Sequence, residues 1–231
     1  MSRPVTICLP NCEVATCCSD LHRGKPGHPA TDATPGWAPA WAAVCAWTVP
    51  EVIAMSARGQ CEVRTIKLAL GDMNELLQFR RRELLELAPT DVEGNHDRWT
   101  GPRDLVLETR RGRTLFTHGH CADPWWAKVF GAPAAWAARV LQCIRRDLDR
   151  KAVDLVRRTV GLGCYGDAEK YAHRLAERAC RLECEQVVFG HLHELFRSCV
   201  VVEHAGRLHR VRVVCTGCCV DGRMDFVDVE V

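Results

Sequence analysis

The sequence has almost no net charge and no long apolar stretch. Its 231 residues contain 31 lysines and arginines against 29 aspartates and glutamates, which leaves a formal net charge of +2. Nucleic-acid-binding domains usually carry a clear basic excess, so we expect no nucleic acid partner. No apolar run approaches the roughly 20 residues that span a bilayer. The residues from Val5 to Pro10 are too few and too interrupted for a signal-peptide core, and we expect a cytoplasmic protein.

The composition also lacks the biases of non-globular proteins. Hydrophobic residues make up 47% of the chain and charged residues 26%, which are ordinary values for a folded domain. These values exclude disorder, collagen and coiled coil, and no internal repeat or low-complexity tract is visible. The length fits one domain with a small cap, so we predict a single domain over residues 1–231.

Cysteine and histidine, by contrast, are abundant, with 15 and 10 residues. A secreted disulfide scaffold is short and has regularly spaced cysteines, whereas here the number is odd and many cysteines lie in apolar runs. We therefore predict buried thiols in a reducing compartment. Cys215 and Cys218 form a CxxC pair, but the pair follows a strand-like run and lacks a partner pair at zinc-binding spacing. This context favours a structural role.

Apolar periodicity predicts an alternation of strands and helices. Strands are predicted over residues 13–18, 63–70, 90–93, 105–108, 113–117 and 186–189, with antiparallel strands between residues 200 and 231. Helices are predicted over residues 40–58, in two pieces interrupted by Pro50, and over residues 75–87, 124–158 and 167–184, with a loop over residues 24–39. This order of elements is compatible with an α/β fold.

Five short polar clusters each follow a predicted strand. They are Asp20-x-His22, Gly71-Asp72-x-x-Glu75, Gly94-Asn95-His96-Asp97, His118-Gly119-His120 and Gly190-His191-x-His193. Strand ends converge on one edge of a sheet, so the loops that follow them can build one site. Six of the ten histidines lie in these clusters beside aspartate and asparagine oxygens. Mixed nitrogen and oxygen donors suit Mn²⁺, Fe or Zn²⁺.

The ordered set of clusters resembles the calcineurin-like metallophosphoesterase superfamily, whose pattern is DxH, GDxx(D/E), GNH(D/E), a later His-Gly and GHxH. All five blocks stand in this chain in that order, from Asp20 to His193. The resemblance implies a four-layer α/β/β/α sandwich of two mixed sheets. It also implies a helical cap insert, which we place over residues 124–184.

The same resemblance implies a binuclear metal site, with Mn²⁺ expected and Fe or Zn²⁺ as alternatives. Seven side chains would hold the metals: Asp20, His22 and His193 the first, Asn95, His118 and His191 the second, and Asp72 both. A hydroxide that bridges the metals would attack a phosphoester or diphosphate bond. His96 would donate a proton to the leaving group or stabilise the transition state, and Asp97 would orient His96. His120 would support the site from outside the ligand set.

Within the superfamily, three segments resemble the bacterial branch that includes UDP-2,3-diacylglucosamine diphosphatase: residues 19–22, 183–193 and 214–225. This resemblance implies a lipid-linked nucleotide substrate and peripheral contact of the cap with the inner face of the membrane. Trp125, Trp126 and Trp136 beside a run of arginines suit such contact, although an amphipathic helix more often covers its own core. Asn74 and Leu77 depart from this branch, where Phe and Trp are usual, and so does His96, where Arg is usual.

Two other functions remain open on the sequence. One is a catalytically silent metal-binding scaffold of the same fold, and the presence of all seven ligands together with His96 argues against it. The other is a nuclease or phosphoprotein phosphatase of the superfamily. The balanced net charge and the lack of a long basic stripe count against the nuclease.

Overall fold

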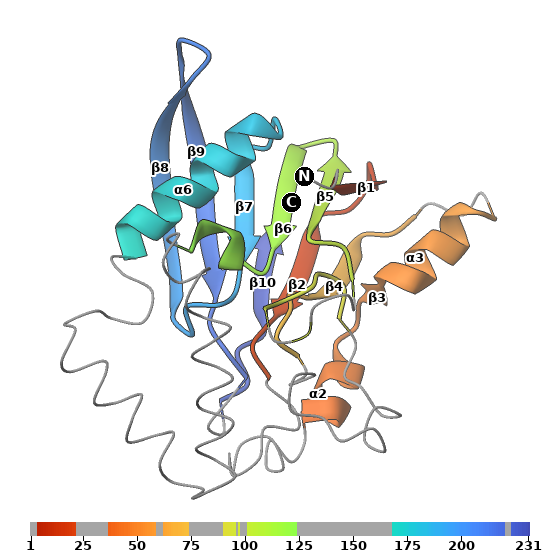
Figure 1. Ribbon diagram of the computed structural model, residues 1–231. Helices are drawn as coiled ribbons and strands as arrows, with labels where there is room; N and C mark the ends of the chain where they lie inside the picture. The colour runs from red at the N-terminus through yellow and green to blue at the C-terminus, as the bar shows by residue number, and fades with distance from the viewer. Residues whose placement is uncertain are drawn as a thin grey trace, which may run out of the picture.

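The computed structural model of the protein describes residues 4–21, 37–58, 62–73, 90–95, 97, 101–123, 168–219 and 223–231. Two mixed β-sheets pack face to face at its centre (Figure 1). Sheet A has six strands in the order β1 (Val5–Cys8), β5 (Asp104–Thr109), β6 (Gly112–Thr117), β7 (Gln186–Phe189), β9 (Arg207–Thr216) and β8 (Leu195–His204). Sheet B has four strands in the order β10 (Val227–Glu230), β2 (Val14–Cys18), β4 (Thr65–Ala69) and β3 (Trp47–Thr48).

Parallel pairing at the centre of each sheet places successive strand ends side by side. In sheet A, β6 and β7 run parallel, and Thr117 pairs with Phe189 at their carboxyl ends. In sheet B, β2 and β4 run parallel, and Cys18 pairs with Ala69 at theirs. The loops that leave these four strands therefore start close together, as expected for parallel strands.

Alternating side chains on the strands of sheet A fill two separate apolar layers. On β6, Phe116 points into the core between the sheets, whereas Leu115 points to the opposite face, toward helix α6 (Ala168–Arg181). On β5, Leu105 and Leu107 share the first layer and Val106 the second. A period of two is the geometric signature of a strand that is buried on both faces.

Helices cover the outer face of each sheet. Helix α6 buries Tyr171, Leu175 and other apolar residues of its inner face against sheet A (Figure 1). On the other side, Trp37 and Trp41 of helix α2 (Trp37–Ala43) pack against the outer face of sheet B. Helix α3 (Val49–Ser56) contributes Val52 to the core between the sheets. No helix within the described ranges has the length and apolarity to cross a membrane.

The layers α6, sheet A, sheet B and α2 confirm the predicted α/β/β/α sandwich of two mixed sheets. Helix α6 confirms the helix predicted over residues 167–184, and it lies within the predicted cap insert of residues 124–184. It packs on sheet A, while residues 124–167 lie outside the described residues. The division into a domain and a cap therefore stays a prediction.

Two local predictions were wrong and one strand was missed, each for a physical reason. Residues 90–93 do not form a strand, because the N–H groups of Asp91 and Val92 both donate to the Ala69 carbonyl and so wrap the end of β4. Strand β1 was not predicted, because it is only four residues long and mostly exposed. The break between the two helices lies before Thr48, the N-cap of α3, and Pro50 sits in the first turn of that helix, where its missing N–H costs nothing.

Three further predictions had different outcomes. The predicted loop over residues 24–39 ends earlier than expected, since α2 begins at Trp37. The antiparallel strands predicted toward the C-terminus are present as β8, β9 and β10, although β9 also pairs in parallel with β7. The helix predicted over residues 75–87 lies outside the described residues.

Candidate metal centre

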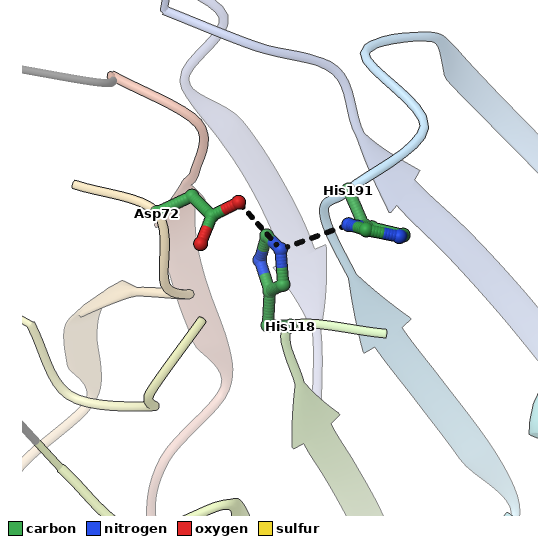
Figure 2. A group of neighbouring side chains, drawn as sticks. All are labelled: Asp72, His118 and His191. Atoms are coloured by element: carbon green, nitrogen blue, oxygen red, sulfur yellow. Dashed lines mark hydrogen bonds and ion pairs between the residues drawn. The ribbon is translucent and has the colours of Figure 1, made fainter. Parts of the chain in front are cut away.

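Four strands deliver polar side chains to one edge of the two sheets. Asp20 follows β2, Asp72 follows β4, His118 follows β6 directly and His191 follows β7. Figure 2 shows the side chains of Asp72, His118 and His191 pointing toward one another from three separate loops. One donor atom from each of these three residues lies within 4.8 Å of the other two, and all three residues are buried.

The imidazole of His118 is at the centre of this group. Its Nε2 lies 3.1 Å from Oδ2 of Asp72, 3.1 Å from Oδ1 of Asn95 and 3.1 Å from Nδ1 of His191. Donor atoms bound at about 2.1 Å to one ion lie about 3 Å apart, so these separations fit a shared ligand shell. The loops thus place the atoms predicted for one metal around a single point.

The hydrogen bonds of the outer ring nitrogens, Nδ1 of His118 and Nε2 of His191, determine which nitrogen of each neutral ring carries the hydrogen. Nδ1 of His118 lies 2.9 Å from the carbonyl of Leu70, which can only accept, so this nitrogen carries the hydrogen. Nε2 of His191 lies 2.9 Å from Oδ1 of Asp123, which assigns its hydrogen in the same way. In the neutral rings, the two inner nitrogens then face each other with lone pairs. Two lone pairs at this distance repel unless a proton lies between them or a metal ion binds both, and the oxygens of Asp72 and Asn95 at the same distance complete a donor set that fits a metal.

Asp20 and His193 form a second pair beside this group. Nε2 of His193 lies 3.2 Å from Oδ1 of Asp20, and the same oxygen lies 4.0 Å from Nε2 of His118. The other oxygen of Asp20 accepts the backbone N–H of His191 at 2.8 Å. The His193 side chain is 36% exposed, whereas that of Asp20 is fully buried. The centre is therefore open to solvent on the His193 side.

Buried carboxylates dominate the electrostatics of the centre. Burial by itself lowers the pKa of His118, but the charges of Asp72 and Asp20 outweigh burial and raise this pKa to about 10. Burial raises the pKa of Asp20, but the charges of His118 and His193 outweigh it and hold the pKa below its usual range. The two carboxylates thus favour a positive charge at the position where the donor atoms converge.

The backbone is strained at the same positions. Six non-glycine residues among those described have a left-handed backbone with positive φ. Four of them are predicted metal ligands, namely Asp20 (φ 55°), Asp72 (φ 50°), His191 (φ 71°) and His193 (φ 58°). Such conformations cost of order 1 kcal/mol or more each and concentrate at functional sites. The surrounding structure holds these side chains in place against local preference.

Asp97 holds two of the loops together. Its carboxylate accepts the backbone N–H groups of Asp72 at 3.0 Å, Met73 at 2.8 Å and Gly94 at 2.7 Å. Gly94 allows the Asp72 loop to pack against its own loop, because a Cβ at that position would overlap the carboxylate of Asp72. Asp97 was predicted to orient His96, which lies outside the described residues. The contacts that are described show Asp97 positioning the Asp72 loop.

Sequence reasoning missed one supporting pair. Asp123 lies just after the short 3-10 helix η2 (His120–Ala122) and accepts from His191, as described above. The hydroxyl of Tyr171 on α6 lies 3.2 Å from the same carboxylate and 2.6 Å from the Gly119 carbonyl. A carboxylate that holds the outer nitrogen of a metal-binding histidine is a common support of such sites. The only sequence signal was an acidic residue close behind the His-Gly block.

The predicted site residues fall into three groups. Five predicted ligands besides Asn95 lie together at the centre: Asp20, Asp72, His118, His191 and His193. Two predicted residues, His22 and His96, lie outside the described residues. The ring of His120 lies 5.7 Å from that of His118 and its Nδ1 has no hydrogen-bond partner within the described part of the chain. Burial lowers the pKa of His120 to about 3, so the ring is neutral. The ligand roles themselves stay predictions.

No family model matches the chain, and no curated protein matches it. Among solved structures, the chain is similar to a predicted phosphoesterase from Streptococcus pneumoniae TIGR4, with 16% identity over 95% of this chain and 83% of that one and a TM-score of 0.41. It is also similar to wild-type Vps29 complexed with Zn²⁺ from Entamoeba histolytica, with 12% identity over 94% of this chain and 86% of that one and a TM-score of 0.41. Vacuolar protein sorting 29 from Cryptosporidium parvum is 12% identical over 95% of this chain and 97% of that one, with a TM-score of 0.37. Likenesses of this degree leave the function to be inferred from the centre itself.

Proposed function

We propose that the protein is a metal-dependent phosphoesterase with a binuclear centre. The observation that supports this most directly is the convergence of acceptor atoms on Nε2 of His118 at 3.1 Å from three directions. Hydrogen bonds among these atoms cannot satisfy all of them, because Nε2 of His118 offers at most one hydrogen to three acceptor atoms, and Nδ1 of His191 offers none when Nε2 of that ring donates to Asp123. A divalent cation satisfies the whole set.

The residues would divide between two metals, with Asp72 as a ligand of both. His118, His191 and Asn95 would hold one metal, and Asp20 and His193 the other, together with His22 by the resemblance of its motif. Bound divalent metals supply positive charge for the phosphoryl oxygens and lower the pKa of bound water. Mn²⁺ is the metal that we expect, because carboxylate, amide and imidazole donors are mixed here, and Fe or Zn²⁺ would also fit.

The side chains around the ligands prepare this centre. Asp123 and the Leu70 carbonyl fix the tautomers of His191 and His118, so that both rings present a lone pair inward. Asp97 holds the Asp72 loop through three backbone N–H groups. Such preorganisation spares the centre the reorganisation that would otherwise accompany the reaction. His96, which follows Asn95 in the same loop, would protonate the leaving group.

The substrate is proposed in two steps. A phosphoester or diphosphate bond follows from the donor set and from the open side at His193. A lipid-linked nucleotide such as a UDP-diacylglucosamine follows only from the resemblance of residues 183–193 and 214–225 to that branch. Contact of residues 124–184 with the inner face of a membrane, and a cytoplasmic location, belong to the same proposal.

Hydrolysis of p-nitrophenyl phosphate and its bis ester, with Mn²⁺ supplied and metals quantified in the same sample, tests this function. We expect turnover in the wild type and a loss in Asp72→Asn that exceeds the 10–100-fold typical for an outer-shell residue. Asp228→Asn is the matched control, because it makes the same chemical change on the exposed side of β10. Tight metal binding without turnover of any phosphoester in Mn²⁺, Fe or Zn²⁺ would show a silent scaffold instead.

A further inference from the structure

Strand β8 forms one edge of sheet A and projects with β9 as a long hairpin (Figure 1). It is ten residues long and pairs over its full length with β9 on its inner side. No strand pairs with its outer edge among the residues that the structure describes. Its backbone N–H and C=O groups on that side form a template for a further strand.

The side chains of β8 do not protect this edge. Soluble proteins usually shield a sheet edge with lysine, proline, a bulge or a very short strand. β8 contains neither lysine nor proline, its charged side chains Arg197 and Glu203 flank its centre, and that centre is the apolar run from Cys199 to Val202. Val201 is 55% exposed and Leu195 is 53% exposed. An edge of this kind is expected to have a partner.

The sequence of β8 is complementary to itself when two copies run antiparallel. A two-fold axis perpendicular to the sheet, midway between the two Val200 residues, pairs side chains that lie on the same face of the sheet, as strand geometry requires. It places Arg197 of each copy opposite Glu203 of the other, so that two opposite-charge pairs form at once. Cys199 then lies opposite Val201. Nearly the whole strand is paired, and no like charges meet.

We propose that two copies of this chain associate through their β8 strands, joining the two six-stranded sheets edge to edge in an antiparallel dimer centred at Val200. Both α6 helices then lie on the same face of the joined sheet. The polar centre at the ends of β2, β4, β6 and β7 is not part of this contact. The proposed dimer can therefore be tested independently of the proposed phosphoesterase activity.

A charge swap tests both the dimer and its register. Sedimentation velocity over a concentration series should show the wild type reaching twice the mass of one chain. Arg197→Glu and Glu203→Arg should each weaken dimerisation about tenfold, because each turns two attractive pairs into two repulsive ones. The double variant Arg197→Glu/Glu203→Arg should restore it. Because Arg197 also donates to the carbonyl of Asp228, the rescue shows that the loss came from charge and not from that bond.

A second pair of variants tests the apolar part of the edge. Val201→Lys should abolish the dimer, whereas Leu208→Lys should leave it intact. Leu208 is 76% exposed and lies in the same hairpin, but on β9, away from the outer edge. Circular dichroism confirms that each variant folds, which is expected for exposed positions.

The register also predicts a specific cross-link. Val201→Cys should form an intermolecular disulfide with Cys199 of a second copy when oxidised glutathione is supplied as the oxidant. Mass spectrometry identifies the linked peptides, and the same variant on a Cys199→Ser background should not form them. A wild type that stays monomeric throughout the series overturns the proposal, as does a dimer that Val201→Lys leaves intact. A monomer in which the outward-facing amides of β8, which do not bond to β9, are protected from hydrogen exchange would show that the chain's own residues cover the edge, and it too overturns the proposal.

Discussion

Phe116 and His118 lie two residues apart at the end of β6, and the side chains of both are fully shielded from water. Phe116 packs with apolar residues of both sheets, in a layer with ordinary strand backbone. His118 lies among carboxylates and imidazoles, in loops with left-handed backbone. Burial stabilises the first region by removing apolar surface from water. In the second region burial opposes stability, because charged groups lose their hydration.

The comparison shows that equal burial has opposite meanings in the two regions. The apolar layer lowers the free energy of the folded chain by itself. Burial of the polar side chains around His118 becomes favourable only when their hydrogen bonds and a bound cation compensate for the hydration that they lose. Substitutions in the apolar layer should therefore act on stability. Substitutions around His118 should act on ligand binding and on the pH dependence of stability.

The largest effect on stability is expected in the apolar layer. Phe116→Ala removes a fully buried aromatic ring and should cost about 3–5 kcal/mol of the free energy of unfolding. Urea denaturation of the metal-free protein measures it. Phe116→Leu keeps most of the volume and should cost much less. An equal loss in both variants would contradict a packing effect.

The partly buried Asp91 lies at the boundary of the two regions, where its carboxylate accepts the Ala69 N–H at 2.8 Å. Burial raises its pKa to about 6, and the bond from Ala69 opposes this only in part. The folded state therefore holds the Asp91 proton more tightly than the unfolded state does. Stability should be fully present below about pH 4 and should fall as the pH rises toward 6.

Asp91→Asn should remove this fall, because the amide cannot ionise yet still accepts from Ala69. The variant should match the wild type in acid and exceed it by about 2–3 kcal/mol at neutral pH. Thermal unfolding in the presence of a chelator, compared between the two proteins across this range, measures the difference. If the stability of the two proteins changed with pH in the same way, ionisation of Asp91 would not be the cause of the fall.

The smallest of these effects is expected from the support of His191. Asp123→Ala removes the acceptor at Nε2 of His191 and should weaken metal binding about 10–100-fold. Competition with a chromophoric chelator measures the affinity. Tyr171→Phe, which leaves that carboxylate in place, should have a smaller effect. A variant that loses stability without losing metal affinity would place Asp123 with the apolar layer, as a structural residue.

The two regions also differed in how well the sequence predicted them. Most strands of the apolar layer follow from short apolar runs, such as Leu105 to Leu107 on β5 and the pair Leu115 and Phe116 on β6. The position of the polar clusters behind strands predicted that they meet at one site, whereas the ligand set followed only from the resemblance of the five motifs to a known superfamily. Asp123 could not be predicted, since its contact with His191 depends on how η2 turns the chain. Nor could the strand expected over residues 90–93 be excluded, because the Ala69 carbonyl that captures its N–H groups belongs to a distant segment.

Burial also divides the cysteines by reactivity. No disulfide joins the cysteines that the structure describes, and most of their thiols are buried. Burial raises the pKa of Cys12 to about 11 and that of Cys215 to about 12, so that only about one such thiol in ten thousand or fewer is a thiolate at pH 7. Alkylating reagents should therefore modify the exposed Cys8, Cys45 and Cys199 first. Because Cys199 lies on the outer strand, its rate of alkylation becomes a footprint of whatever covers the edge of sheet A.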